Sequence, residues 1–257
     1  LDVLRRVPGM VCQIAAVEVR SEASVWIPAW LYLPHKQDRQ KPVLLVLEPG
    51  GRNRDWAEGD LYQSVAGEGY PVCAVDVRGV GDLSPEFGRH APGYARSHNQ
   101  EEDYAWASLI FGRPLLGQRV TDILAVSSAL RSDAALKGRR LAVAARGHLT
   151  VPALFAAALE KDLDQLYLAG GLVSFQSIVE TENYSHPFGN FISGLLKHTD
   201  LPEIAASVAP RRVVLAGAVG ADGSGLDLSV VQQAYPDASN VDILPGAKWD
   251  VETLARI

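Results

Sequence analysis

The chain has 257 residues, of which 47 % are apolar, and a net charge of −6. This length and composition predict a single α/β domain over residues 1–257 that buries its core without disulfides, and the acidic balance argues against a nucleic-acid partner. No apolar run approaches the ~18 residues that a membrane-spanning helix needs, so we expect no membrane partner.

The first segments of the chain predict an antiparallel hairpin. Residues 13–20 and 25–33 are both rich in β-forming residues, and a polar turn separates them. Residues 42–47 follow as a short apolar run that ends in Glu48-Pro49-Gly50-Gly51. That pattern is typical of a buried strand that enters a glycine turn.

The rest of the chain alternates between short apolar runs and helical patterns. Helices are predicted over 61–67, 118–131 and 152–159. Further strands are predicted over 70–77, 140–145, 165–169, 212–217 and 240–244. An irregular stretch covers 82–99, and the largest insertion, 170–200, is expected to overhang the crevice at the strand ends. The alternation predicts a mostly parallel sheet with helices on both faces and the hairpin at one edge.

The two cysteines, Cys12 and Cys73, are expected to be buried free thiols, because Cys73 lies in an apolar run. They therefore point to no redox compartment. The chain begins with Leu1 rather than methionine, and its final helical pattern stops at Ile257. We take this as the sign of a piece of a longer, tandem protein. Neither the compartment nor the oligomeric state follows from the sequence.

Several motifs resemble those of a known superfamily. Pro49-Gly50-Gly51 after one strand and Asp76-Val77-Arg78-Gly79-Val80-Gly81 after the next resemble the front half of an α/β-hydrolase. Arg113-Pro114-Leu115-Leu116-Gly117-Gln118-Arg119, Asp200-Leu201-Pro202-Glu203 and Ala209-Pro210-Arg211-Arg212 resemble the acetyl xylan esterase-like branch. The resemblance covers nearly the whole chain. It implies an α/β-hydrolase fold, carboxylesterase chemistry, an oxyanion turn at Gly50 and Gly51, and a secreted or periplasmic location.

The nucleophile of such an enzyme sits in a Gly-x-Ser-x-Gly turn between a strand and a helix. The only junction of that kind in this chain places the motif on Ala145-Arg146-Gly147-His148-Leu149, with Gly147 at the position of the serine. No serine or cysteine lies between Ser132 and Ser174, so a small shift of register does not restore a nucleophile. Thr150 is the nearest hydroxyl, and a role in bonding the backbone of the first helical turn is expected for it.

The catalytic histidine is also missing from its expected place. In this superfamily it follows the last strand, but the last histidine of this chain is His198. Lys248 is the residue nearest to that position, and an ordinary charged lysine cannot accept the proton of a nucleophile. The triad acid is expected after strand 212–217, where Gly220 or Asp222 lies, depending on the register, and Asp222 stands in a sequence typical of a turn. His148, beside Gly147, is the other polar candidate at this site.

Neither a cofactor nor a metal is expected. The glycines of 217–225 do not form the Gly-x-Gly-x-x-Gly fingerprint of a dinucleotide site. The segment 222–227 is too short for a calcium loop and lacks the closing glutamate. Glu101-Glu102-Asp103 is typical of the solvated start of a helix.

Three functions remain open. The first is a degenerate, non-catalytic domain (a pseudoenzyme) that accompanies an active carboxylesterase domain of the same polypeptide. The second is a carbohydrate or small-molecule binding module that uses the old crevice. The third is an active ester hydrolase with an unusual site built from His148, Thr150, Asp222 and Lys248.

Overall fold

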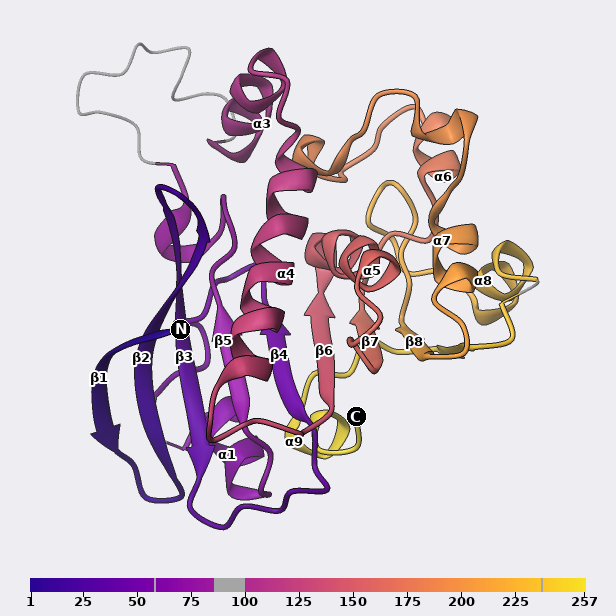
Figure 1. Cartoon of the computed structure of the whole chain (residues 1–257). Helices are drawn as coiled ribbons and strands as arrows, with labels where there is room; N and C mark the ends of the chain where they lie inside the picture. The colour runs from indigo at the N-terminus through magenta and orange to yellow at the C-terminus, as the bar shows by residue number, and fades with distance from the viewer. Residues whose placement is uncertain (58, 86–99, 237) are drawn as a thin grey trace.

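The computed structural model describes residues 1–57, 59–85, 100–236 and 238–257 (Figure 1). A nine-stranded sheet in the order β1-β2-β3-β5-β4-β6-β7-β8-β9 crosses the whole molecule. Its first strands, β1 (Asp2–Pro8), β2 (Cys12–Glu22) and β3 (Val25–Pro34), are antiparallel. The predicted hairpin is confirmed as β2 and β3. Strand β1 escaped prediction because all of its side chains are exposed, so no alternation of buried and exposed positions marks it.

The remaining strands form the parallel part of the sheet. They are β5 (Val72–Val75), β4 (Val43–Leu47), β6 (Leu141–Arg146), β7 (Gln165–Ala169), β8 (Arg212–Ala216) and β9 (Val241–Leu244). These six strands pair in parallel with one another. The two parts of the sheet are joined by an antiparallel pair, β3 with β5. The central runs are buried throughout because helices cover both faces of a parallel sheet. The predicted mixed α/β sheet is thus confirmed.

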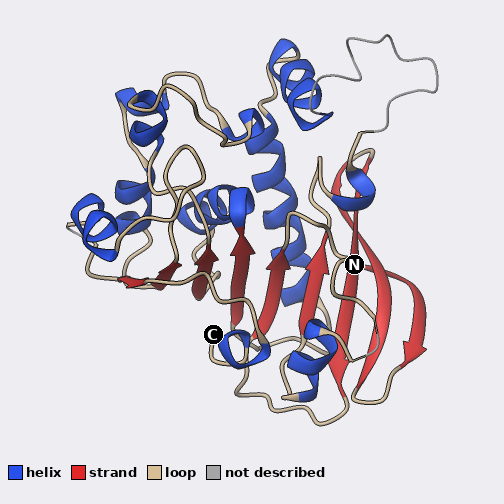
Figure 2. Ribbon diagram, turned by 180° about the vertical axis from the view of Figure 1, so that it is seen from behind, coloured by secondary structure: helices blue, strands red, loops and turns tan. Residues whose placement is uncertain are grey.

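Helices pack on both faces of the sheet, as Figure 2 shows from behind. One face is covered by α4 (Leu115–Ser132), α5 (Thr150–Leu159), α7 (Leu201–Ser207) and α8 (Leu228–Ala234), whose buried side chains share one apolar core. The other face is covered by α1 (Leu61–Gly67) and α9 (Val251–Leu254). None of the helices in the described parts of the chain has the length and apolar character required to cross a membrane.

Two elements lie beyond the sheet. Helix α3 (Gln100–Ile110) stands at one end of α4, and the insertion 170–200 contains α6 (Phe175–Val179) and two short 3₁₀ turns, η3 (Phe188–Asn190) and η4 (Leu195–Lys197). Most of the predicted irregular stretch 82–99 falls on residues 86–99, which lie outside the described residues.

A buried ion pair joins the front of the sheet to α4. Arg78, in the turn after β5, donates to Asp122 of α4 through its backbone N–H, Nε and Nη2 at 2.7–3.1 Å. Its Nη1 also contacts Glu22 at the end of β2 at 2.9 Å. The strand predicted over 70–77 is shorter in the structure, where β5 covers Val72–Val75 and the chain then enters the turn that contains Asp76 and Arg78. Both cysteines are buried and free, as expected, and burial raises the pKa of Cys12 to about 11 and that of Cys73 to about 12.

Candidate functional site

The junction between β6 and α5 is a sharp turn at Gly147. Strand β6 ends at Arg146, a single 3₁₀ turn (Gly147–Leu149) follows, and α5 begins at Thr150. Gly147 has a φ of +55°, which costs strain in a residue that carries a Cβ. A Cβ placed on Gly147 would lie 3.3 Å from Pro49 Cγ, which is a tight contact, so Pro49 would have to shift slightly to admit a side chain.

The glycine turn after β4 lies against the turn after β5. Gly51 has a φ of +80°, and a Cβ on it would lie 2.8 Å from Gly81 Cα. The buried carboxylate of Asp76 accepts hydrogen bonds from the backbone N–H groups of Arg52, at 2.6 Å, and Asp82, at 2.9 Å. Burial is the main cause of a raised pKa at Asp76. The two motifs at the front of the chain therefore form one unit.

A second buried carboxylate connects this unit to Gly147. Glu48, which is 2 % exposed, pairs with Arg54 at 2.7 Å and with Arg146 at 3.5 Å. Because Arg146 directly precedes Gly147, the pair holds the end of β6 beside the turn that contains Gly50 and Gly51.

The predicted acid and base positions do not turn their side chains to Gly147. The Asp222 carboxylate accepts from Ser224 N at 3.0 Å and from Ser224 Oγ at 2.6 Å. These hydrogen bonds lower its pKa, and the contacts are those of a turn aspartate. Lys248 is exposed and lines a hollow with Tyr167 and Arg212, whereas Gly147 lines a different one. The structure places Pro49, which directly precedes Gly50 and Gly51, against Gly147, whereas Asp222 and Lys248 are directed elsewhere.

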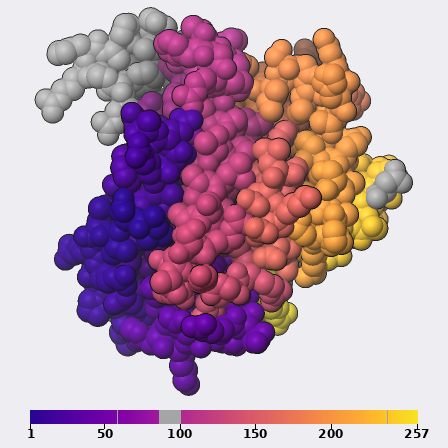
Figure 3. All heavy atoms as spheres, viewed as in Figure 1, coloured from indigo at the N-terminus to yellow at the C-terminus, as the bar shows by residue number. Residues whose placement is uncertain are grey.

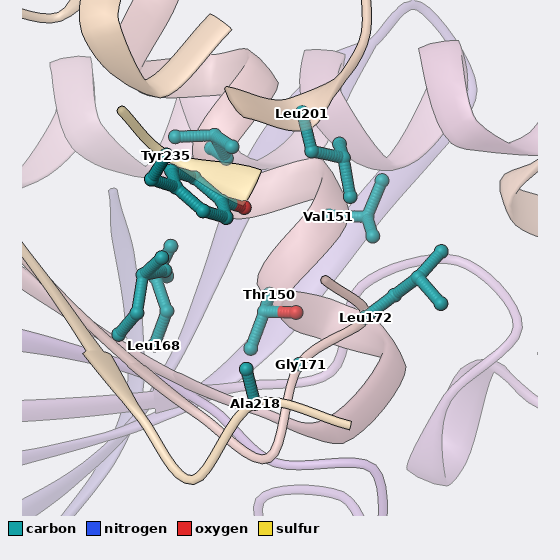
Figure 4. Close-up of a pocket in the computed structure, with 10 residues that line it drawn as sticks. Thr150, Val151, Leu168, Gly171, Leu172, Leu201, Ala218 and Tyr235 are labelled. Carbon is teal, nitrogen blue, oxygen red and sulfur yellow. The ribbon is translucent and has the colours of Figure 1, made fainter. Parts of the chain in front are cut away.

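Thr150 is buried and bonds the backbone, as expected for the first turn of a helix. Its Oγ1 donates to the carbonyl oxygen of Gly147 at 2.8 Å. Its side chain borders an apolar void of about 10 Å³ between α5, β7 and β8, with Leu168 and Tyr235 among the other walls (Figure 4). A void of this size holds about one water molecule, so it cannot admit an ester.

A hollow of about 150 Å³ borders Gly147 and contains two histidines, His148 and His186. Burial is the main cause of their lowered pKa values, about 3 for His148 and about 4 for His186, and the positive charge of Arg119 lowers both further. Both rings are therefore neutral at pH 7. His148 was named from the sequence. His186 was not, because it lies in the 170–200 insertion and belongs to no local motif.

The hydrogen bonds around Asn190 determine the tautomer of His186. The buried guanidinium of Arg119 pairs with Glu101 at 3.0 Å and approaches Asn190 Oδ1 at 3.4 Å. Asn190 Nδ2 must then donate, and it does so to the His148 carbonyl oxygen at 2.7 Å and to His186 Nε2 at 3.1 Å. The proton of neutral His186 is therefore on Nδ1. The Nε2 atom of His148 is buried and has no hydrogen-bond partner among the described residues.

The site as described holds neither a nucleophile–base pair nor a metal cluster. Among the residues that the structure describes, no serine, threonine or cysteine side chain is hydrogen-bonded to a histidine. Within the same ranges no group of three or more His, Cys, Asp or Glu side chains is arranged to hold a metal ion.

Comparison with known proteins gives fold matches only. No protein-family model matches the chain, and no curated protein sequence does. Among solved structures, a proposed acetyl xylan esterase from Bacteroides fragilis superimposes with a TM-score of 0.75 at 18 % identity, over 96 % of this chain and 70 % of the other. The acetyl xylan esterase from Paenibacillus sp. R4 gives 0.66 at 17 % identity, over 96 % and 83 %. A dienelactone hydrolase from Anabaena variabilis gives 0.54 at 13 %, over 95 % and 94 %. The chain therefore has the α/β-hydrolase fold, in an arrangement similar to that of acetyl xylan esterases.

Proposed function

We propose that this chain is an esterase-like α/β-hydrolase domain that does not hydrolyse esters by itself and that serves as the non-catalytic partner of a carboxylesterase domain. The observation that carries the proposal is Gly147, which stands in the strained turn between β6 and α5 where this fold holds its nucleophile. Acyl transfer on this fold needs a nucleophile, a base and an acid within hydrogen-bond reach of one another. Gly147 has no side chain, and Asp222 and Lys248 are directed elsewhere.

Backbone strain in this turn explains why glycine would replace serine in a domain that does not catalyse a reaction. A residue with a Cβ at such a backbone conformation costs about 1–3 kcal/mol. A domain relieved of catalysis keeps its fold and loses this strain when glycine takes the position.

The test is reaction of the folded chain with a fluorophosphonate probe, together with turnover of short-chain aryl acetates. We expect no stoichiometric labelling. Removal of triad groups can still leave a rate roughly 10³–10⁴-fold above that in water, so only turnover on the order of 1 s⁻¹ counts as activity on the scale of ordinary enzymes. Stoichiometric labelling or turnover at that level would overturn the proposal. An active serine carboxylesterase, labelled in parallel, controls for the quality of the probe.

The partner role has a separate test. The complete reading frame is expected to encode a second hydrolase domain with an intact Gly-x-Ser-x-Gly motif and a histidine after its last strand. Expressed together, the two domains should co-purify. A reading frame without such a domain would remove the partner role and leave the proposed lack of activity intact.

A second candidate function, a small-molecule binding module, is favoured by the hollow beside Gly147. It offers His186 with its proton on Nδ1 and the unpartnered Nε2 of His148. Its volume of about 150 Å³ is below the roughly 300 Å³ of typical ligand pockets, so only a small oxygen-bearing ligand fits. Calorimetric titration with acetate and with xylose checks this candidate. Binding that a His186→Gln variant abolishes would favour it over the partner role.

A further inference from the structure

An apolar groove of about 690 Å³ lies in the 170–200 insertion, away from Gly147. We call it the insertion groove, and its walls include Leu109, Phe175, Val179, Phe188, Phe191 and Leu196. Figure 3 shows α3 (magenta) and the insertion (orange) side by side at the top of the molecule, where the groove is formed. The ring of His186 separates it from the hollow beside Gly147, because that ring packs at 6.3 Å from Phe175 and 6.2 Å from Phe191.

The walls of the insertion groove are fixed by ring contacts. Phe191 is at the centre, with ring centroids 6.4 Å from Phe175, 5.6 Å from Tyr184 and 5.4 Å from Phe188. Phe188 in turn stacks on Trp106 of α3 at 4.4 Å. The groove is thus a formed feature of the structure, and its volume is within the range of small-molecule sites.

Several apolar side chains of the insertion groove are exposed to solvent. Val179 is 70 % exposed and Tyr184 is 48 % exposed. Contiguous apolar surface of this kind marks binding sites in water-facing proteins.

One charge indicates which occupant fits. Among the described residues that line the groove, Lys197 is the only charged one, and none is a carboxylate. The Lys197 side chain is exposed, and its ammonium forms no ion pair with any residue in the described ranges. In a chain with a net charge of −6, an apolar groove that carries a single unpaired cation is complementary to a molecule with one apolar tail and one negative head.

We propose that the insertion groove binds an unbranched aliphatic carboxylate, with the hydrocarbon tail against Phe175, Phe188 and Phe191 and the carboxylate at Lys197. The tail is bound by removal of apolar surface from water, and the ammonium selects an anion over a neutral or cationic head. The site does not involve Gly147, so it exists whether or not the chain hydrolyses esters.

The test is calorimetric titration of the folded chain with decanoate below its micellar concentration, compared with 1-decanol and decyltrimethylammonium. We expect decanoate to bind with one site per chain and the cationic analogue to bind more weakly. A Lys197→Met variant, which keeps a long apolar stem, should weaken decanoate by up to roughly fivefold, the upper end of the range of an exposed ion pair, and leave decanol unchanged. Lys197→Arg should restore decanoate. Equal binding of all three ligands, or decanoate affinity that Lys197→Met does not change, would overturn the assignment of the head group.

A second variant tests the tail. Val179→Glu places a carboxylate in the groove at a position exposed enough to leave the fold intact, and it should weaken decanoate at least tenfold. Val230→Glu is the matched control, because Val230 is 46 % exposed on α8 and does not line the groove. Unchanged binding in Val179→Glu contradicts the proposal. The proposal is also contradicted if the wild-type chain does not bind decanoate but forms a dimer, and if Val179→Glu dissociates that dimer. The groove would then be occupied by a second copy of the chain.

Discussion

At the scale of one residue, the proposed lack of ester hydrolysis depends on Gly147. Its φ of +55° and the 3.3 Å contact that an added Cβ would make with Pro49 Cγ mean that a serine at this position is strained and tightly packed. We expect Gly147→Ser to lower the free energy of unfolding by about 1–3 kcal/mol and to bring no ester turnover, because Asp222 and Lys248, at the expected acid and base positions, are directed elsewhere. Denaturant unfolding and an aryl acetate assay measure the two effects.

The control for this prediction is Gly117→Ser. Gly117 lies in α4, has no positive φ and has open space around its Cα, so this change should be neutral or slightly stabilising. Adding Lys248→His to Gly147→Ser should still give weak activity, since Asp222 is held in its own turn. Robust turnover by Gly147→Ser alone, at full stability, would mean that a competent base already faces the turn.

The two half-buried histidines beside Gly147 predict a pH dependence of stability. Their pKa values, about 3 for His148 and about 4 for His186, are below the value of about 6.5 in the unfolded chain. As the pH falls below 6.5, the unfolded state takes up protons that the native state does not, so the free energy of unfolding decreases until the folded pKa values are reached. The slope is up to about 1.4 kcal/mol per pH unit for each histidine.

Urea unfolding between pH 7 and pH 4 measures this slope. Buried carboxylates add their own dependence, so the informative quantity is the difference between the wild type and a His148→Gln/His186→Gln variant, which should have the shallower slope. His198→Gln changes an exposed histidine and should leave the slope as it is. Equal slopes in all three proteins would contradict the neutral state of the pair.

At the scale of elements, Asp200 fixes both ends of the insertion. Its Oδ1 accepts from Phe175 N and Leu201 N, both at 2.7 Å, and its Oδ2 accepts from Gln176 N at 2.9 Å. One carboxylate therefore caps the first turns of α6 and α7 together. Asp200→Ala should cost about 1–2 kcal/mol and weaken decanoate, because Phe175 would lose its anchor in the wall of the groove.

The matched control is Asp250→Ala, which removes the cap of α9. The Asp250 side chain accepts from Thr253 N at 2.8 Å, and α9 packs on the other face of the sheet, far from the insertion groove. This variant should lose comparable stability while it binds decanoate as the wild type does. Equal loss of binding in both variants would show that general destabilisation, not the anchoring of Phe175, controls the groove.

At the scale of the whole molecule, the sheet predicts one cooperative unit. The antiparallel strands meet the parallel part only through β3 and β5, along Ala29–Tyr32 and Val72–Val75, but Arg78 contacts both Glu22 of β2 and Asp122 of α4. Urea unfolding of the unaltered chain should therefore give the same midpoint by tryptophan fluorescence and by far-ultraviolet circular dichroism. Two separate midpoints would divide the chain into two folding units.

Sequence pattern alone predicted much of this fold. Strands that are buried on both faces consist of consecutive apolar residues. Runs such as 165–169 and 140–145 could therefore be recognised as strands from the sequence. The motifs around Gly51, Asp76 and Gly147 are also local, so the order of residues is enough to locate the turn that lacks a nucleophile. Strand β1 was missed because backbone hydrogen bonds to β2 hold it in place. Such bonds do not depend on the side chains, so the sequence pattern does not predict them.

Only the tertiary structure decided what surrounds Gly147 and where a ligand can bind. Arg119, Asn190 and His186 come from α4 and from an insertion about 70 residues later in the chain, and no spacing rule links them. Packing between distant segments also sets where the side chains of Asp222 and Lys248 point. It likewise places α3 against the insertion, which forms the groove. The sequence by itself determined the buried strands, the position of the turn at Gly147 and the absence of a serine there, because these depend on neighbouring residues. The neutral histidine pair and the unpaired Lys197 depend on burial and on charges from distant segments, and those exist only once the chain has folded.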